Sequence, residues 1–202
     1  VEWKPASNFT MSLGPGLDRA LEDAQYVQLY GASAVAPGEV PADFGGRRYV
    51  FARLDQTTIS ANFRFDVSFT RNLTLQTYIQ PLIAAGRYGD FKELARAGSY
   101  DFIHYGRDNG STYAPATGIV DPGDGRTPFE LPDPSFNFKS LRGNAVLRWE
   151  YRPGSLLYFV WTQERTDFEP RGDLRFGPSS RRLFDAQAND IFLVKATYYL
   201  NL

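Results

Sequence analysis

The chain has 202 residues and a formal net charge of −1, so nucleic acid and polyanionic substrates are not expected as partners. It contains no cysteine and one histidine, which excludes disulfides, thiolate metal sites and multi-histidine metal sites. Aromatic residues make up 15% of the chain, a content typical of β-rich proteins. The length suits a single domain over residues 1–202, and no motif predicts a cofactor.

Alternation of apolar and polar residues predicts strands along most of the chain. A stub at 1–3 leads into a strand near 8–19, which residues 25–30 could extend. Five more strands are predicted near 48–69, 73–88, 138–151, 156–168 and 190–202. The one helical candidate is DFKELARA, residues 90–97.

Short and long connections alternate between these strands. The turns at 4–7, 70–72 and 152–155 are minimal, whereas three long connections are rich in Gly, Pro and Asp. The long connections cover about 31–47, 89–137 and 169–189. In a meander this places every short turn at one end of the sheet and every long loop at the other. That asymmetry is typical of outer-membrane barrels.

The hairpin over 58–80 shows the clearest alternation. Side chains alternate across a strand, so one face of this hairpin is apolar and the other polar. The apolar set predicted to face lipid is Ile59, Phe63, Phe65, Val67, Leu73 and Leu75. We therefore predict an all-β fold, an antiparallel meander that forms the C-terminal part of a transmembrane outer-membrane β-barrel. A soluble β-sandwich would show the same alternation and remains the alternative.

The polar parity of the strands carries many charges. In a barrel these residues would line the lumen, and in a sandwich they would be ordinary solvent-facing residues. Because an unpaired Arg is costly in a narrow lumen, we expect a network of ion pairs that spans neighbouring strands. Its predicted members are Arg64, Asp66, Arg142, Arg148 and Glu150.

The last strand has one apolar parity that includes Phe192, Val194, Tyr198, Leu200 and Leu202. This pattern is similar to the C-terminal targeting strand of outer-membrane barrels, although such strands usually end on Phe or Trp. Only six full strands and a stub are predicted, and bacterial barrels begin at eight strands. We therefore expect upstream strands or another chain to complete the barrel.

The parity of the apolar residues changes inside residues 48–58. Val50, Ala52 and Leu54 are apolar at even positions, whereas the apolar residues from Ile59 onward are odd. This change predicts a β-bulge or a break near residues 55–56. A bulge would turn Arg53 and Asp55 inward; otherwise this half of the strand would rise clear of the membrane.

Signals for catalysis are weak, and no enzyme is predicted. His104 has no Ser or Cys partner at a recognisable spacing, so a structural role is favoured. Asp121 and Asp124 could bind Ca²⁺, but their loop lacks the ligand density of an EF-hand, and a solvated turn is favoured. Asp55 and Glu150 could form a glycosidase pair, but lumen ion pairs are the simpler interpretation.

Four stretches carry a resemblance to a bacterial family: RRYVFARLDQTTIS (47–60), AGRYGDFKELARAGSYDF (85–102), LRGNAVLRWEYRPGSLLYFVWTQ (141–163) and LFDAQANDIFLVKATYYL (183–200). They resemble the C-terminal domain of uncharacterised outer-membrane proteins with an N-terminal family-9-like carbohydrate-binding domain. The resemblance is weakest over 20–46 and 107–135.

The resemblance implies a location in the bacterial outer membrane, contact with the lipid bilayer, and glycans as possible partners. It implies a role in surface carbohydrate binding, uptake or anchoring, without catalysis. The alternative is a soluble all-β carbohydrate-binding or carbohydrate-active module, whose aromatic residues would stack on sugars.

Overall fold

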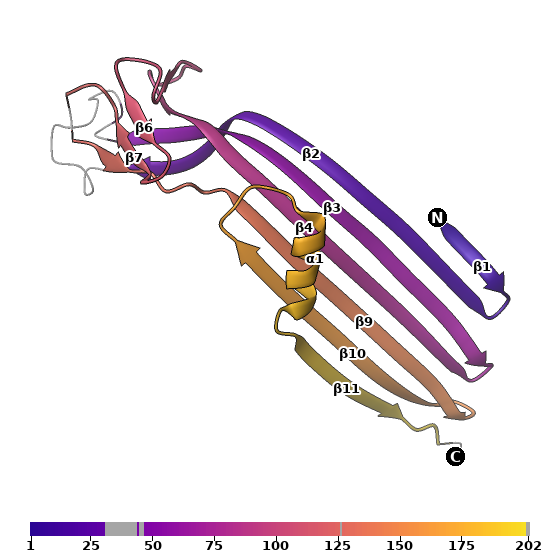
Figure 1. Ribbon diagram of the computed structural model, residues 1–202. Helices are drawn as coiled ribbons and strands as arrows, with labels where there is room; N and C mark the ends of the chain where they lie inside the picture. The colour runs from indigo at the N-terminus through magenta and orange to yellow at the C-terminus, as the bar shows by residue number, and fades with distance from the viewer. Residues whose placement is uncertain (31–43, 45–46, 126, 201–202) are drawn as a thin grey trace.

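One long antiparallel sheet dominates the computed structural model, which describes residues 1–30, 44, 47–125 and 127–200 (Figure 1). The sheet has eight strands, and seven follow one another in a meander. These seven are β1 (Glu2–Ala6), β2 (Phe9–Tyr30), β3 (Arg48–Thr70), β4 (Leu73–Leu94), β9 (Phe136–Arg152), β10 (Ser155–Glu169) and β11 (Asn189–Thr197). The eighth, β5 (Phe102–His104), pairs with the end of β4. The predicted all-β antiparallel meander is confirmed at this level.

The sheet is open in the part of the chain that the structure describes. β1 pairs only with β2, and β11 pairs only with β10. β1 covers residues 9–12 of β2, so most of that long edge has no paired neighbour. Unpaired strand edges expose rows of backbone N–H and C=O groups, which template the addition of further strands.

The connections divide into two kinds at the two ends of the sheet. Turns at 7–8, 71–72 and 153–154 join neighbouring strands at one end, here called the short-turn end (Figure 1). Gly154, in the last of these turns, has φ +77°. Residues with a side chain rarely adopt this conformation, so the tight turn requires glycine here. The connections from β4 to β9 and from β10 to β11 leave their strands at the other end, here called the loop end (Figure 1). Most of the predicted long connection 31–47 lies outside the described residues. The segregation predicted from loop lengths is therefore present for the connections that the structure describes.

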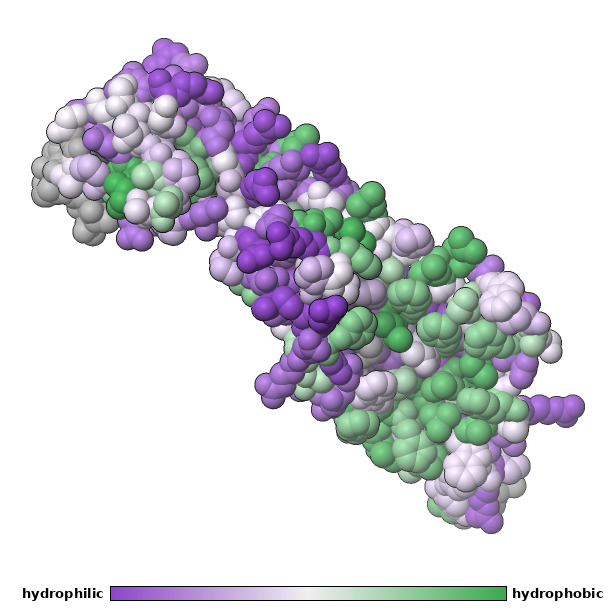
Figure 2. All heavy atoms as spheres, in the orientation of Figure 1, coloured by the Kyte–Doolittle hydropathy of each residue, from purple (hydrophilic) through white to green (hydrophobic). Residues whose placement is uncertain are grey.

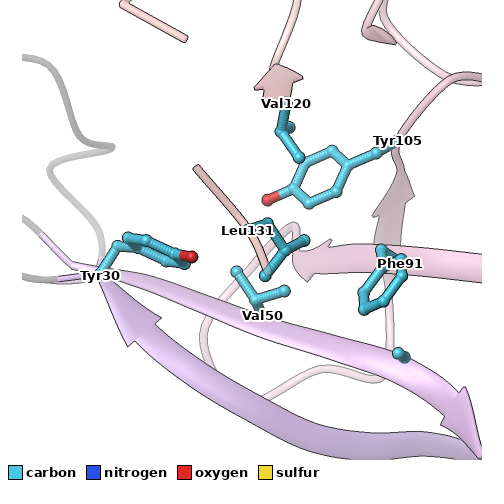
Figure 3. Close-up of a cluster of buried hydrophobic side chains, with 7 residues drawn as sticks. Tyr30, Val50, Phe91, Tyr105, Val120 and Leu131 are labelled. Carbon is cyan, nitrogen blue, oxygen red and sulfur yellow. The ribbon is translucent and has the colours of Figure 1, made fainter. Parts of the chain in front are cut away.

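The loop end carries a second, three-stranded sheet, made of β6 (Thr112–Ala114), β7 (Ile119–Asp121) and β8 (Phe129–Glu130). It packs on the ends of β2, β3 and β4 through a cluster of buried side chains, which Figure 3 shows. The cluster consists of Tyr30, Val50, Ala52, Phe91, Tyr105, Val120 and Leu131. We call this folded segment, residues 102–131, the loop-end cap.

An ion pair is buried beneath the loop-end cap. Arg48 is only 2% exposed, and its guanidinium donates to both carboxylate oxygens of Glu93 at 2.8 and 2.6 Å. Its other nitrogen donates to Asp124 at 2.7 Å. The hydroxyl of Tyr105 also donates to Glu93, at 3.3 Å. The Asp124 loop is therefore tied to the sheet, while residues 123–125 are exposed as the predicted solvated turn would be.

The predicted helix over 90–97 is wrong. Residues 90–94 continue β4, where Phe91 and Glu93 are buried against the loop-end cap. The one helix of the described residues is α1 (Phe176–Asp185), inside the long connection between β10 and β11. No helix in the described part of the chain is long and apolar enough to cross a membrane.

The predicted bulge near residues 55–56 is also wrong. β3 pairs without interruption with β4 from Arg53 to Ser60, and the irregularity lies between Phe51 and Arg53. Asp55 therefore lies on the same face as Ile59 and Phe63, further toward the loop end. The apolar parity changes because Val50, Ala52 and Leu54 pack on the opposite face, which the loop-end cap covers.

We expect Arg48→Met to loosen the loop-end cap. The substitution leaves the Glu93 carboxylate buried without its guanidinium partner, a change that typically costs about 3–5 kcal/mol. Amide hydrogen exchange across residues 102–131 should become much faster, while exchange across β9 and β10 should stay the same. Arg19→Met is the matched control, because Arg19 pairs with Asp55 at an exposed position. Equal exchange in both variants would contradict a stabilising role for the buried pair.

Candidate functional site

The strand register separates the long sheet into two chemically different faces. On one face, apolar side chains form continuous rows across the strands, and we call it the apolar face. One row is Phe9, Val67, Leu75, Leu147, Phe159 and Val194. The next is Met11, Phe65, Ala145, Trp161 and Phe192, with Thr77 of β4 between Phe65 and Ala145. Rows of apolar side chains are normally shielded from water by another part of the protein, by a partner or by lipid.

No second sheet covers the apolar face in the described residues, since the only other sheet is the short one at the loop end. Phe192 is 75% exposed and Trp161 is 39% exposed. Figure 2 shows the resulting apolar surface over the half of the sheet near the short-turn end. Large exposed apolar surfaces of this kind mark contacts with protein or membrane.

The height of this surface fits a membrane. From Ile59 to Phe69 the strand advances ten residues, about 33 Å at the usual rise. A strand tilted by about 40° would cover about 25 Å of height over that length, the height of the apolar band of outer-membrane barrels. Trp149 and Tyr151 lie at the short-turn end of the surface with ring centroids 6.1 Å apart.

The six residues predicted to face lipid all lie on the apolar face. They share it because the pairing is regular: Phe63 lies opposite Ile79, Val67 opposite Leu75, and Leu73 opposite Trp149. Of the predicted targeting strand, Phe192 and Val194 also lie on this face, in β11. Tyr198 and Leu200 follow the strand and are exposed, and Leu202 lies outside the described residues.

The opposite side, here called the polar face, carries short hydrogen-bonded groups across neighbouring strands. Arg64 lies over the ring of Tyr78 at 5.8 Å, and the Tyr78 hydroxyl donates to Asn62 at 2.6 Å. Asn144 donates to Thr162 at 3.0 Å. Each cross-strand contact of this kind contributes a fraction of a kcal/mol, roughly 0.2–1. The polar face is therefore braced locally.

The five residues of the predicted ion-pair network share the polar face but do not join into one network. Arg148 and Glu150 approach at 3.9 Å, while Arg142 pairs with Glu164 at 2.9 Å, a partner the sequence analysis did not name. Among the described residues, no ion pair of Asp66 is found. The alternation of residues predicted the face of these side chains correctly. It did not predict their partners, because Arg142 pairs with Glu164 and Arg64 lies over Tyr78.

Helix α1 docks on the apolar-face side of the sheet, just beyond the apolar rows. Lys139 lies beneath it, fully buried, with Nζ 2.7 Å from Asp167 and 2.6 Å from Glu169. Arg182 of α1 binds Asp167 through two hydrogen bonds of 2.9 Å and reaches Glu169 at 3.3 Å. Four charges thus form one cluster, which we call the α1 cluster.

Hydrogen bonds from side chains of the sheet, and a close approach of the backbone, also position α1. Asn137 donates to the carbonyl of Asp173 at 3.0 Å and to the hydroxyl of Ser179 at 3.3 Å. A side chain at Gly172 would meet Arg87 Cα at 2.5 Å, so the chain before the helix lies directly on β4. Arg165 donates to the carbonyl of Phe184. The sheet therefore holds both ends of the helix.

Helix α1 and its cluster were not predicted from the sequence, although two signals were present. Charged residues on the apolar parity, such as Lys139 and Asp167, mark where the apolar rows end. The stretch FGPSSRRLFD also has apolar residues seven and eight positions apart, at Phe176, Leu183 and Phe184, the spacing of one helix side.

The candidate catalytic groups do not assemble into a site. His104 Nδ1 lies 2.8 Å from Asp90, a carboxylate that Lys92 and Arg107 also approach at 3.6 Å. Although burial alone would raise the pKa of Asp90, His104 and the two cations hold it below its usual value. Asp55 and Glu150 lie on opposite faces at opposite ends of the sheet, so they cannot act as a pair.

Comparison with known proteins identifies one family. The model of a family described as a domain of unknown function, DUF5916, matches residues 8–202. The chain belongs to this family. No curated protein and no solved structure matches the chain significantly.

The α1 cluster should make helix docking sensitive to acid. The hydrogen bond from Arg182, followed by that from Lys139, lowers the pKa of Asp167, and Lys139 lowers the pKa of Glu169. A lowered pKa means that the stabilisation is present above the ordinary values, 3.8 and 4.5, and is lost as the pH falls below them. Amide exchange across residues 171–186 should therefore accelerate below about pH 4.

Asp167→Asn is the matched variant for this prediction. It removes one titrating member of the cluster, so α1 should exchange faster at neutral pH and respond less to acid. Unchanged exchange across α1 between pH 7 and pH 3, in the presence of an intact sheet, would show that the cluster does not hold the helix.

Proposed function

We propose that this domain forms part of the wall of a bacterial outer-membrane β-barrel, with its apolar face toward lipid. One observation carries the proposal: a two-sided sheet leaves a continuous apolar surface uncovered, and the surface has the height of an outer-membrane band. The soluble sandwich requires a second sheet on this surface, and the described residues offer none. In the proposed arrangement, lipid covers the apolar face in place of a second sheet.

The proposal includes further strands at both open edges. Backbone groups inside a bilayer must be paired within the protein, so an open edge is costly there. The free edges of β2 and β11 would pair with other strands of the same protein or of another chain. The charged polar face, with Arg64, Arg142 and Arg148, would then line a wet lumen.

The biological role that we propose is surface carbohydrate binding, uptake or anchoring. Its support is the resemblance to outer-membrane proteins with a family-9-like carbohydrate-binding domain. In this arrangement the loop end faces outward, as long loops do in outer-membrane barrels. The loop-end cap then lies over the outer end of the polar face, where Arg48 fastens it to the sheet. The cap would therefore narrow the entrance to the lumen.

Phe65→Arg tests the lipid-facing assignment. Phe65 lies near the middle of the apolar rows, where an arginine in a barrel wall costs about 2–4 kcal/mol. The free energy of unfolding should fall by that amount in the full-length protein, measured by urea titration in phospholipid vesicles. Gln76→Arg is the matched control, because Gln76 is exposed on the polar face at nearly the same level. It should change the free energy little.

Two outcomes would contradict the proposal. Equal effects of the two variants would mean that neither face meets lipid. Recovery of the wild-type protein in the aqueous fraction, with the apolar face protected from exchange, would favour the soluble carbohydrate-binding module.

A further inference from the structure

Helix α1 lies where the apolar face ends. On β9 and β10, the rows nearest the helix run through Arg165 opposite Leu141 and Asp167 opposite Lys139, whereas the rows that are apolar on both of these strands begin at Trp161 opposite Ala145. Gln163 and Asp190, which are hydrogen-bonded at 2.9 Å, lie between these levels. In Figure 1, α1 crosses β9 and β10, and Figure 2 shows the apolar surface adjoining it toward the short-turn end.

The contacts of α1 fix its orientation about its own axis. Ser179 and Leu183 are buried and face the sheet. Arg182 binds Asp167 and Glu169, which lie toward the loop end of β10, so this flank of the helix points away from the apolar rows. Residues four apart share a side of a helix, so Phe176, Ser180 and Phe184 form the opposite flank, which points toward the apolar rows.

This flank has no cover from the described residues. Phe176 and Phe184 are each 62% exposed, an unusual position for two phenylalanines on one short helix. A ten-residue helix is not stable by itself in water, so its place depends on the sheet contacts. The sheet thus holds two phenylalanine rings outward, beside the apolar face and continuous with it.

The segment that contains α1 has a net positive charge. Residues 171–185 contain four arginines and two aspartates. Arg175 pairs with Asp173 at 2.7 Å, and Arg182 belongs to the α1 cluster. Arg181 and Asp185, four residues apart, share the side of α1 that points away from the sheet, and both are exposed. No ion pair of Arg181 is found among the described residues. A helix with an aromatic flank and a charged outer side, in a segment of net positive charge, has the pattern of helices that lie in the interfacial layer of a membrane.

We propose that α1 is an interfacial helix that binds anionic phosphorylated lipids of the leaflet on the loop side. Phe176 and Phe184 insert among the upper acyl chains, and Arg181 binds a headgroup phosphate. This inference rests on the proposed function, because a lipid surface reaches α1 only if the apolar face is embedded. It adds a lipid-binding site and sets the depth of the domain in the membrane.

The first experiment locates the helix relative to lipid. The chain has no cysteine, so single cysteines can carry a fluorophore. In the full-length protein in vesicles, Ser180→Cys reports on α1, Val194→Cys on the apolar face and Asn144→Cys on the polar face. Brominated phosphatidylcholine should quench the labels at 180 and 194 but not the label at 144.

These labels separate the two proposals. Quenching at 194 without quenching at 180 would overturn the interfacial helix and leave the membrane wall intact. Absence of quenching at both positions would overturn both. A disulfide that forms between two copies through Ser180→Cys, without quenching, would show that a second copy of the chain covers the flank, and this too would overturn the inference.

The second experiment tests the phosphate contact. Brominated phosphatidylglycerol competes with phosphatidylcholine for the surface around the label at 180. Because each basic residue near an anionic surface contributes modestly, Arg181→Gln should lower the relative association of phosphatidylglycerol about fivefold. Arg107→Gln, which alters an exposed arginine of the loop-end cap, is the matched control and should leave it unchanged. Equal association in both variants would overturn the assignment of Arg181.

Discussion

The two chemically different faces of this domain depend on the register of one antiparallel sheet, which is regular through the apolar rows. Because side chains alternate across each strand, a slip of one residue would exchange the two faces completely. The register holds Phe65 opposite Met11 and Thr77, and it holds Arg64 opposite Ser12 and Tyr78. The same hydrogen bonds that pair the strands therefore create an apolar surface and a polar surface back to back. Short two-residue turns at one end help to fix that register.

The apolar face has a defined upper limit, and charges define it. Lys139, Asp167 and Asp55 occupy the same parity as the apolar residues, but each lies nearer the loop end than the residues of its own strand that belong to the apolar rows. Buried charges must be paired, and Asp167 and Glu169 of β10 pair with Lys139. Arg182 of α1 adds a second cation to these two carboxylates, and the helix covers Lys139. The exposed rings of Phe176 and Phe184 on this helix extend the apolar surface toward the loop end.

The sequence predicted the long sheet well, because period-two alternation is a local signal in each strand. The prediction from sequence was wrong where contacts between distant parts of the chain determine the local structure. Residues 90–94 have a helical composition, but Phe91 and Glu93 are buried against the loop-end cap, which holds them in β4. Alternation also gave the face of Arg142 but not its partner Glu164, since a long side chain can reach several neighbours. The short helix α1 was missed because ten residues carry little periodic signal and its stability comes from the sheet.

The two ends of the polar face differ in how firmly their charges are held. Near the short-turn end, Arg148 and Glu150 are partly exposed and 3.9 Å apart, an arrangement that contributes little to stability. At the loop end, Arg48 and Glu93 are buried with short bidentate contacts, and burial also raises the pKa of the neighbouring Tyr30 to about 12. Opening the cap would take Asp124 and Tyr105 away from Arg48 and Glu93, whereas Arg148 and Glu150 are already in contact with water. The charged side chains at the loop end are therefore held in place by burial under the cap, and those near the short-turn end are not.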